Sequence, residues 1–248
     1  MTAFIRLILS SKEYYKVLPY ILHLKPLGIW FSGEDCIIYF PAETKEHLSG
    51  FKFDEISWEP ASIPSKTLPF KPYFRVTLVS RPEKFWHKSR HVKILLGPAF
   101  GTAEHPTTAR MIKIILGLKK YKSCIDFGAG TGILGLVFEK ITRGRCYYVE
   151  IDPLALDNLR ANLAMNRSKG CIVKLEDVKL SEVILANVYL ETIINNIDIL
   201  LSKKPKLLVL SGIRASDDLT LLQKRLAICS LYEDDGWLTC VALPRGIN

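Results

Sequence analysis

The sequence predicts an α/β fold: a doubly wound sheet of about seven strands that ends in an antiparallel hairpin, preceded by a small α+β domain. Beyond about residue 107, short apolar runs alternate with segments of helical periodicity, which is typical of parallel strands joined by crossover helices. The last two β-rich runs, 229–232 and 237–243, are joined by a connection too short for a crossover helix. These two strands should therefore pair antiparallel.

The elements of the large domain follow from composition and spacing. Short runs of Val, Ile and Leu predict strands, and apolar residues three and four apart predict helices. The expected strands span 123–127, 145–149, 171–175, 183–186 and 206–210, and the expected helices span 132–140, 153–166, 190–201 and 217–227.

Three units are expected along the chain. Residues 1–57 should form the small α+β domain, with a strand at 2–9, a helix at 12–24 and a hairpin within 28–40. Residues 58–92 should be a linker and connecting strand, because four prolines between 58 and 72 interrupt helix and strand pairing, and a strand follows at 73–80. The large domain should span 93–248.

Composition excludes several classes of protein. With 48% hydrophobic residues the chain can bury a core, which excludes intrinsic disorder. The six cysteines show no CxxC pair and no clustering with histidine, so no metal site is expected. Arg6 interrupts the apolar N-terminus, and no run is long enough to span a membrane. A cytoplasmic protein is therefore expected, and we also expect a monomer. Its net charge of +9 suits polyanionic surroundings without proving nucleic-acid binding.

A glycine-rich loop lies between the first strand of the large domain and the next helix. It contains Asp126, Gly128 and Gly130, and its glycines permit positive φ and close approach of a nucleotide-like ligand. The dinucleotide fingerprint would need Gly or Ala at Ile133, so the loop does not predict an NAD enzyme. It suits a ligand without phosphate, such as S-adenosylmethionine.

Two further polar residues end neighbouring strands. Glu150 stands where a carboxylate meets ribose hydroxyls in such folds, while Asp152 before Pro153 is better placed to cap a helix. Asn187 ends the fourth strand, where it either binds a ligand or caps the following helix. The sequence there, Asn-Val-Tyr-Leu, lacks the two prolines of the Asp- or Asn-Pro-Pro-Tyr motif found in enzymes that methylate planar nitrogens; were the chain a methyltransferase, this would favour a flexible aliphatic amine as substrate.

A loop rich in functional groups precedes the first sheet strand. It contains Phe100, His105 and Thr108 within a few positions. From the residue types alone, two interpretations remain open: these residues bind a ligand, or they only form a loop that leads into a helix starting at Pro106.

Several motifs, in order and spacing, resemble those of the PrmA family of ribosomal protein L11 methyltransferases, which have the class I methyltransferase fold. The matching stretches are 100–108, 126–134, 150–155, 184–188 and 208–213. The resemblance implies S-adenosylmethionine as cofactor, an N-terminal domain that grips the ribosomal protein, and methylation of lysine side chains and an N-terminal α-amine. The family's cofactor contacts map onto Thr108, Gly128, Glu150 and Asn187. The family has glycine at Ala103 and aspartate at Glu150.

These observations define a candidate site. Phe100, Thr108, Asp126, Gly128, Gly130, Glu150 and Asn187 are the expected cofactor-binding residues, and Asn187 and His105 are the expected catalytic residues. Asn187 should hold the amine, whereas His105 serves either as a base or as an organiser of its loop. Two alternatives are a relative with another protein substrate and a non-catalytic module that binds S-adenosylmethionine. The basic residues of 81–93 are either ordinary solvated charges or a contact with ribosomal RNA.

Overall fold

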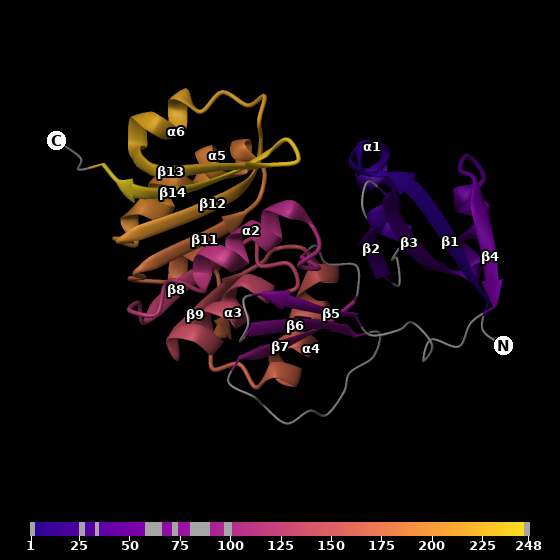
Figure 1. Cartoon of the computed structure of the whole chain (residues 1–248), viewed down its shortest axis with the longest axis horizontal. Helices are drawn as coiled ribbons and strands as arrows, with labels where there is room; N and C mark the ends of the chain where they lie inside the picture. Colours follow the sequence, from indigo (N-terminus) through magenta and orange to yellow (C-terminus); the bar gives the residue numbers. More distant parts are fainter. Residues whose placement is uncertain are drawn as a thin grey trace.

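The computed structural model describes residues 3–24, 28–32, 35–57, 66–70, 74–79, 90–96 and 101–245. Its largest sheet has seven strands in the order β10-β9-β8-β11-β12-β14-β13 (Figure 1). The strands are β8 (Ser123–Phe127), β9 (Arg145–Val149), β10 (Cys171–Ile172), β11 (Val183–Asn187), β12 (Leu207–Arg214), β13 (Leu226–Asp234) and β14 (Trp237–Pro244).

The pairing of these strands confirms the predicted fold class. β8 to β12 are parallel to one another, and β14 pairs antiparallel with both β12 and β13. The carboxyl ends of the parallel strands consequently lie at one edge of the sheet, where open α/β sheets bind ligands.

Helices cover both faces of this sheet and create two cores. Side chains alternate between the faces along each strand, so that in β11 Val183 and Leu185 face one core and Ile184 and Ala186 face the other. The first core holds α2 (Pro106–Ile115), α3 (Ile133–Thr142) and α4 (Pro153–Asn166), and the second holds α5 (Leu190–Ser202) and α6 (Thr220–Arg225).

Two elements of the large sheet differ from the sequence prediction. The strand expected at 171–175 pairs only over Cys171–Ile172, because the chain then turns and buries Leu175 in a 3-10 turn. The helix expected at 217–227 is shorter, since Leu226 already pairs with Pro244 of β14. A turn replaces the end of the expected strand, and strand pairing replaces the end of the expected helix, because tertiary contacts outweigh local propensity.

The N-terminal residues form a separate four-stranded antiparallel sheet in the order β2-β3-β1-β4 (Figure 1). It contains β1 (Ala3–Ser10), α1 (Ser11–Ile21), β2 (Gly28–Ser32), β3 (Asp35–Pro41) and β4 (Phe53–Ser57), with 3-10 turns at Leu22–Leu24 and Ala42–Leu48. The expected strand, helix and hairpin are confirmed. The strand β4 was not predicted, because Asp54 and Glu55 break its apolar pattern.

A third sheet occupies part of the proline-rich segment that was expected to be a linker. It has the order β5-β6-β7, with β5 (Lys66–Phe70), β6 (Phe74–Val79) and β7 (His91–Leu95). Pro69 is tolerated in β5 because this strand lies at the edge of the sheet. Phe70, Phe74 and Val76 are buried in the same core as α2 and α3. The large structural unit therefore includes residues from 66 onward, earlier than the expected boundary at 93.

Asparagines of α4 cover the open edge of β7. Asn158 donates to the carbonyl of Leu95 over 3.2 Å, and Asn162 accepts from its backbone N–H over 2.7 Å. Asn166 accepts from the N–H of Lys93 and donates to its carbonyl. The spacing of four residues places all three amides on one face of the helix. They satisfy backbone groups that a neighbouring strand would otherwise bond.

Replacing Asn162 with alanine should lower the free energy of unfolding by about 2–4 kcal/mol, because it leaves the partly buried N–H of Leu95 and the buried carbonyl of Thr131 without these partners. Chemical denaturation measures this change. Asn195→Ala, on the exposed face of α5, is the matched control, with an expected change within about 0.5 kcal/mol. Equal stability of the two variants would show that the amides of α4 do not hold the sheet edge.

Within the described residues, no helix combines the length and the apolar composition needed to span a membrane.

Candidate functional site

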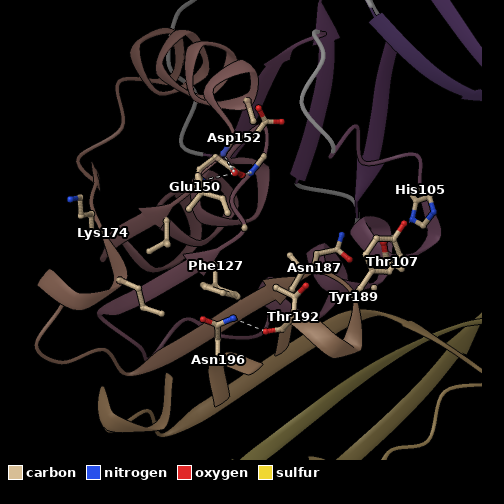
Figure 2. A pocket seen from close by; sticks show the side chains of 18 of the residues that line it. His105, Thr107, Phe127, Glu150, Asp152, Lys174, Asn187, Tyr189, Thr192 and Asn196 are labelled. Atoms are coloured by element: carbon tan, nitrogen blue, oxygen red, sulfur yellow. Dashed lines mark hydrogen bonds between the residues drawn. The ribbon is translucent and has the colours of Figure 1, made fainter. Parts of the chain in front are cut away.

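A cavity of about 660 Å³ opens at the carboxyl ends of β8, β9 and β11. Figure 2 shows Glu150 and Asp152 on one side of it, His105 and Thr107 on the other, and Asn187 in between. Its size is in the range of sites that enclose a nucleoside-sized molecule. Apolar side chains form much of its wall, including Phe127, Val149, Ile151, Val173 and Leu175.

The glycine loop after β8 brings main chain directly to this cavity. The N–H groups of Gly128 and Ala129 both donate to the carbonyl of Val149, over 2.9 and 3.0 Å. Gly128 has a φ of +68°, and a Cβ there would lie 2.4 Å from Cγ1 of Val188. Only glycine fits this position, both because of its conformation and because of the space.

Asp126 lies beneath the loop and does not line the cavity. Its carboxylate accepts from the N–H of Gly135 over 2.9 Å, in the first turn of α3. Burial raises the pKa of Asp126 to about 7, against the lowering effect of this hydrogen bond, and the nearby charge of Glu150 raises it further. Asp126 therefore fixes the start of α3 and, through it, the end of the glycine loop, without lining the cavity itself.

Glu150 lines the cavity and also holds the glycine loop. One carboxylate oxygen accepts from the N–H of Gly130 over 2.8 Å, and the other accepts from the N–H groups of Ile151 and Asp152. Asp152 accepts from the N–H of Leu154 and caps α4, as expected. Glu150 is thus held in one orientation by three main-chain donors, which leaves about one acceptor position of the carboxylate for a ligand in the cavity that it lines.

Asn187 lines the centre of the cavity. Its Nδ2 donates to Oγ1 of Thr108 over 3.1 Å, and Thr108 is itself fully buried. The buried Oδ1 of Asn187 has no hydrogen-bond partner within the described part of the chain. The residue does not cap α5, whose N-cap is Tyr189. Asn187 therefore presents a fixed hydrogen-bond acceptor, Oδ1, to a donor group of a bound ligand.

His105 is buried at the far side of the cavity. Its Nδ1 lies 2.7 Å from Oγ1 of Thr107, and its ring meets that of Trp237 edge-on at 5.4 Å. Burial lowers the pKa of His105 to about 4, so the imidazole is neutral at pH 7. A group with this pKa is a poor acceptor for the proton of a lysine ammonium, whose pKa is near 10.4. The geometry favours a positioning role over a base.

The loop that carries His105 is fixed to the glycine loop. Thr131 donates from Oγ1 to the carbonyl of Gly101 over 2.7 Å. Ala103 is buried and has a φ of 65°, the left-handed conformation that favours glycine. The turn is thus retained with alanine at this position.

Replacing His105 with glutamine should leave the pH profile of turnover unchanged in shape between about pH 6 and 9, because the neutral imidazole takes no proton there. Stability gives a second readout. The unfolded histidine binds a proton below about pH 6.5, whereas the folded one does so only near pH 4. Its contribution is therefore complete above pH 6.5 and is lost as pH falls toward 4.

The wild-type advantage over His105→Gln should consequently shrink by up to about 3 kcal/mol between pH 7 and 4. Asp126 titrates in the opposite sense in that range, but it is present in both proteins and cancels in the difference. Urea unfolding at several pH values measures the effect. A turnover profile whose fall at low pH is lost in the variant would instead identify His105 as a base.

The structure brings most of the expected site residues together. His105, Gly128, Gly130, Glu150 and Asn187 line the cavity, whereas Thr108 and Asp126 lie behind it and position lining residues. Phe100 lies outside the described residues.

Sequence reasoning missed several lining residues. They include Tyr14, Thr107, Tyr189, Gly212 and Trp237. Trp237 begins β14, and an antiparallel strand begins at the edge where parallel strands end, so its position was available from the predicted hairpin. Tyr14 comes from α1, and no local signal connects it to the cavity.

Comparison with known proteins agrees with this arrangement. The family model described as ribosomal protein L11 methyltransferase (PrmA) matches residues 41–244. The chain belongs to this family.

Relatives named ribosomal protein L11 methyltransferase include one from Alteromonas mediterranea, 36% identical over 50% of this chain and 46% of the relative. Another, from Aquifex aeolicus, is 30% identical over 63% of this chain and 66% of the relative. The chain thus spans about half the length of several curated relatives that it matches.

A solved structure of ribosomal protein L11 methylase from Lactobacillus delbrueckii subsp. bulgaricus has a TM-score of 0.60 with 18% identity, and the match covers 73% of this chain and 99% of that chain. This likeness shows a shared class I methyltransferase fold and agrees with the predicted fold.

Proposed function

We propose that this protein transfers methyl groups from S-adenosylmethionine to amino groups of ribosomal protein L11, namely lysine side chains and an N-terminal α-amine. The observation that carries the proposal is the unsatisfied Oδ1 of Asn187 in a cavity that also presents Glu150 and the glycine loop. Family membership supports the same activity and substrate.

The residues present fit S-adenosylmethionine. Glu150 is held in place with an acceptor position left for a ribose hydroxyl, and the exposed side chain of Ile151 with Val173 and Leu175 offers apolar contact for a planar base. Carboxylates of Glu150, Asp152 and Glu176 line the cavity beside the single amine of Lys174, which favours a cationic ligand. When bound, this cofactor supplies an electrophilic methyl group, and the amine that takes it loses one proton.

The amine would approach past Asn187. Its Oδ1 can accept a hydrogen bond from the substrate nitrogen and so direct the lone pair toward the methyl group. Tyr189 and Trp237 line the same part of the cavity and add apolar surface around an aliphatic side chain. Partial burial disfavours the ammonium form, which lowers the pKa of the incoming amine and raises the fraction that can react.

Asn187 is held for this task by Thr108. A free asparagine amide would lose rotational freedom when it binds substrate, and the bond to Thr108 removes that freedom beforehand. His105 and Thr107 fix the opposite wall by their mutual hydrogen bond. In this proposal the protein contributes orientation and partial exclusion of water, and the proton leaves to solvent.

The test incubates the protein with methyl-labelled S-adenosylmethionine and the separated proteins of the large ribosomal subunit, followed by mass spectrometry of intact proteins and peptides. Label on lysine or α-amino groups of ribosomal protein L11 is the expected result. Label on another protein would identify a related methyltransferase with a different substrate. Calorimetric binding of the cofactor without any label would instead identify a non-catalytic binding module.

We further propose that the protein is cytoplasmic and monomeric and that it contacts ribosomal RNA. Light scattering should accordingly give a mass near 28.1 kDa. A mass of twice this value would contradict the monomer.

A further inference from the structure

The amino-terminal ends of the parallel strands lie on the side of the large sheet opposite the cavity, and this side carries many positive charges. The strands β8 to β12 are parallel, so the connections that lead into them meet at one edge, away from the carboxyl ends that form the cavity. Each of these connections contains exposed Lys or Arg. We call this set the basic edge: Lys119, Lys120, Lys122, Arg143, Arg145, Arg167, Lys169, Lys179, Lys204 and Lys206.

Hydrogen bonds join these connections into one surface. The N–H of Arg145 donates to the carbonyl of Lys122 over 2.9 Å, and Nε of Arg145 donates to the carbonyl of Lys169 over 3.4 Å. The N–H of Lys206 donates to the carbonyl of Glu182 over 2.8 Å, and the carboxylate of Glu182 accepts from the N–H of Lys122. The basic edge is therefore continuous from β10 to β12.

Among the residues that the structure describes, few carboxylates neutralise this surface. Glu182 pairs with Lys206 over 2.7 Å, and Glu139 is turned inward to accept from the N–H groups of Cys146 and Lys169. Elsewhere on the basic edge, Lys120, Arg143 and Lys204 form no ion pair within the described part of the chain. Because Glu150, Asp152 and Glu176 gather at the cavity, the two edges of the sheet differ in charge.

We propose that the basic edge binds the phosphate backbone of double-stranded RNA. A row of exposed cations across neighbouring connections is what a nucleic-acid backbone needs, since each phosphate contact releases counterions. The aromatic ring in these connections, Tyr121, is half-buried and lies under the ammonium of Lys120 at 5.2 Å. The surface therefore offers no free ring for stacking unpaired bases, which favours a duplex over a single strand.

The choice of RNA over DNA rests on the proposed function, because a ribosomal protein is found beside RNA helices. The length of the parallel strands, about 17 Å for five residues, separates the basic edge from the cavity. A bound helix would consequently leave the cavity open, and the protein could hold RNA on one side while the cavity receives an amine on the other.

The test measures fluorescence anisotropy of a labelled RNA hairpin with a stem of about 20 base pairs, at several salt concentrations. The test variant combines Lys122→Gln, Arg143→Gln, Lys169→Gln and Lys204→Gln, one from each of four connections. The control combines Lys16→Gln, Lys52→Gln, Lys113→Gln and Arg160→Gln, which are exposed elsewhere and remove the same charge. Thermal unfolding of both variants checks that they fold; should the test variant unfold, Lys122→Gln and Lys204→Gln replace it as single changes.

The test variant should raise Kd at least about tenfold and reduce the slope of log K against log salt by about 3, whereas the control should stay within about threefold of wild type. Equal weakening in both variants would show diffuse attraction by net charge and overturn the proposal. Equally tight binding of a DNA duplex of the same sequence would overturn the assignment to RNA, and tighter binding to phosphatidylglycerol vesicles would overturn nucleic acid as the partner.

Methylation of free ribosomal protein separates this proposal from the proposed function. The test variant should methylate at the wild-type rate, because none of its four positions touches the cavity. An inactive wild type that still binds the hairpin through the basic edge would contradict the methyltransferase activity and leave the RNA surface standing. An active wild type that does not bind the hairpin would support the methyltransferase activity and contradict the RNA-binding surface.

Discussion

Replacing Asn187 with leucine should lower the rate of methyl transfer at saturating cofactor by about 100-fold or more. Leucine has nearly the shape of asparagine but lacks the Oδ1 that remains without a partner in the cavity. Loss of a single preoriented polar group at a reacting centre costs about 10² to 10³ in rate. Cofactor affinity should change only a few-fold, because Gly128 and Glu150 supply the neighbouring contacts.

The matched control is Asn196→Leu. Asn196 also lines the cavity, but its amide donates to the carbonyl of Thr192 within its own helix. This change should leave the rate within about threefold of wild type. Single-turnover rates and calorimetric affinities for both variants give the comparison. If Asn187→Leu loses cofactor binding and rate in equal proportion, Asn187 acts on the cofactor site as a whole and not on the amine.

Local signals determined how well each element of the fold could be predicted. The helix α4 was predicted to the residue, because Asp152 was expected to cap its start and Pro153 to fit its first turn. The strand β5 escaped prediction because Pro69 argues against a strand unless its edge position is known. The end of α6 escaped because Leu226 pairs with a strand that is distant in sequence from the helix start.

The candidate site shows the same division between local and tertiary information. The glycine loop, Glu150 and Asn187 could be located because they follow the carboxyl ends of predicted strands. Whether Thr107 or Thr108 faces the cavity depends on the rotation of α2 about its axis, which the sequence does not specify. The placement of Tyr14 depends on a different sheet, and no motif encodes that contact.

Replacing Glu150 with glutamine should weaken cofactor binding by about 10- to 100-fold, although the two side chains have the same shape. Both carboxylate oxygens accept from main-chain donors: one from Gly130, the other from Ile151 and Asp152. An amide must direct its NH2 group at one of these donors, so either flip of the side chain breaks an existing bond and leaves a donor unpaired.

The two flips have different consequences for the site. An NH2 group facing Gly130 releases the glycine loop, while an NH2 group facing Ile151 and Asp152 releases the turn that starts α4. Both outcomes disorder main chain that lines the cavity, so the melting temperature should also fall. Glu176→Gln, at an exposed lining residue, is the control and should bind within about threefold of wild type. Unchanged affinity in Glu150→Gln would mean that the carboxylate is dispensable to the loop, and the ribose contact would then have to be sought at Asp152.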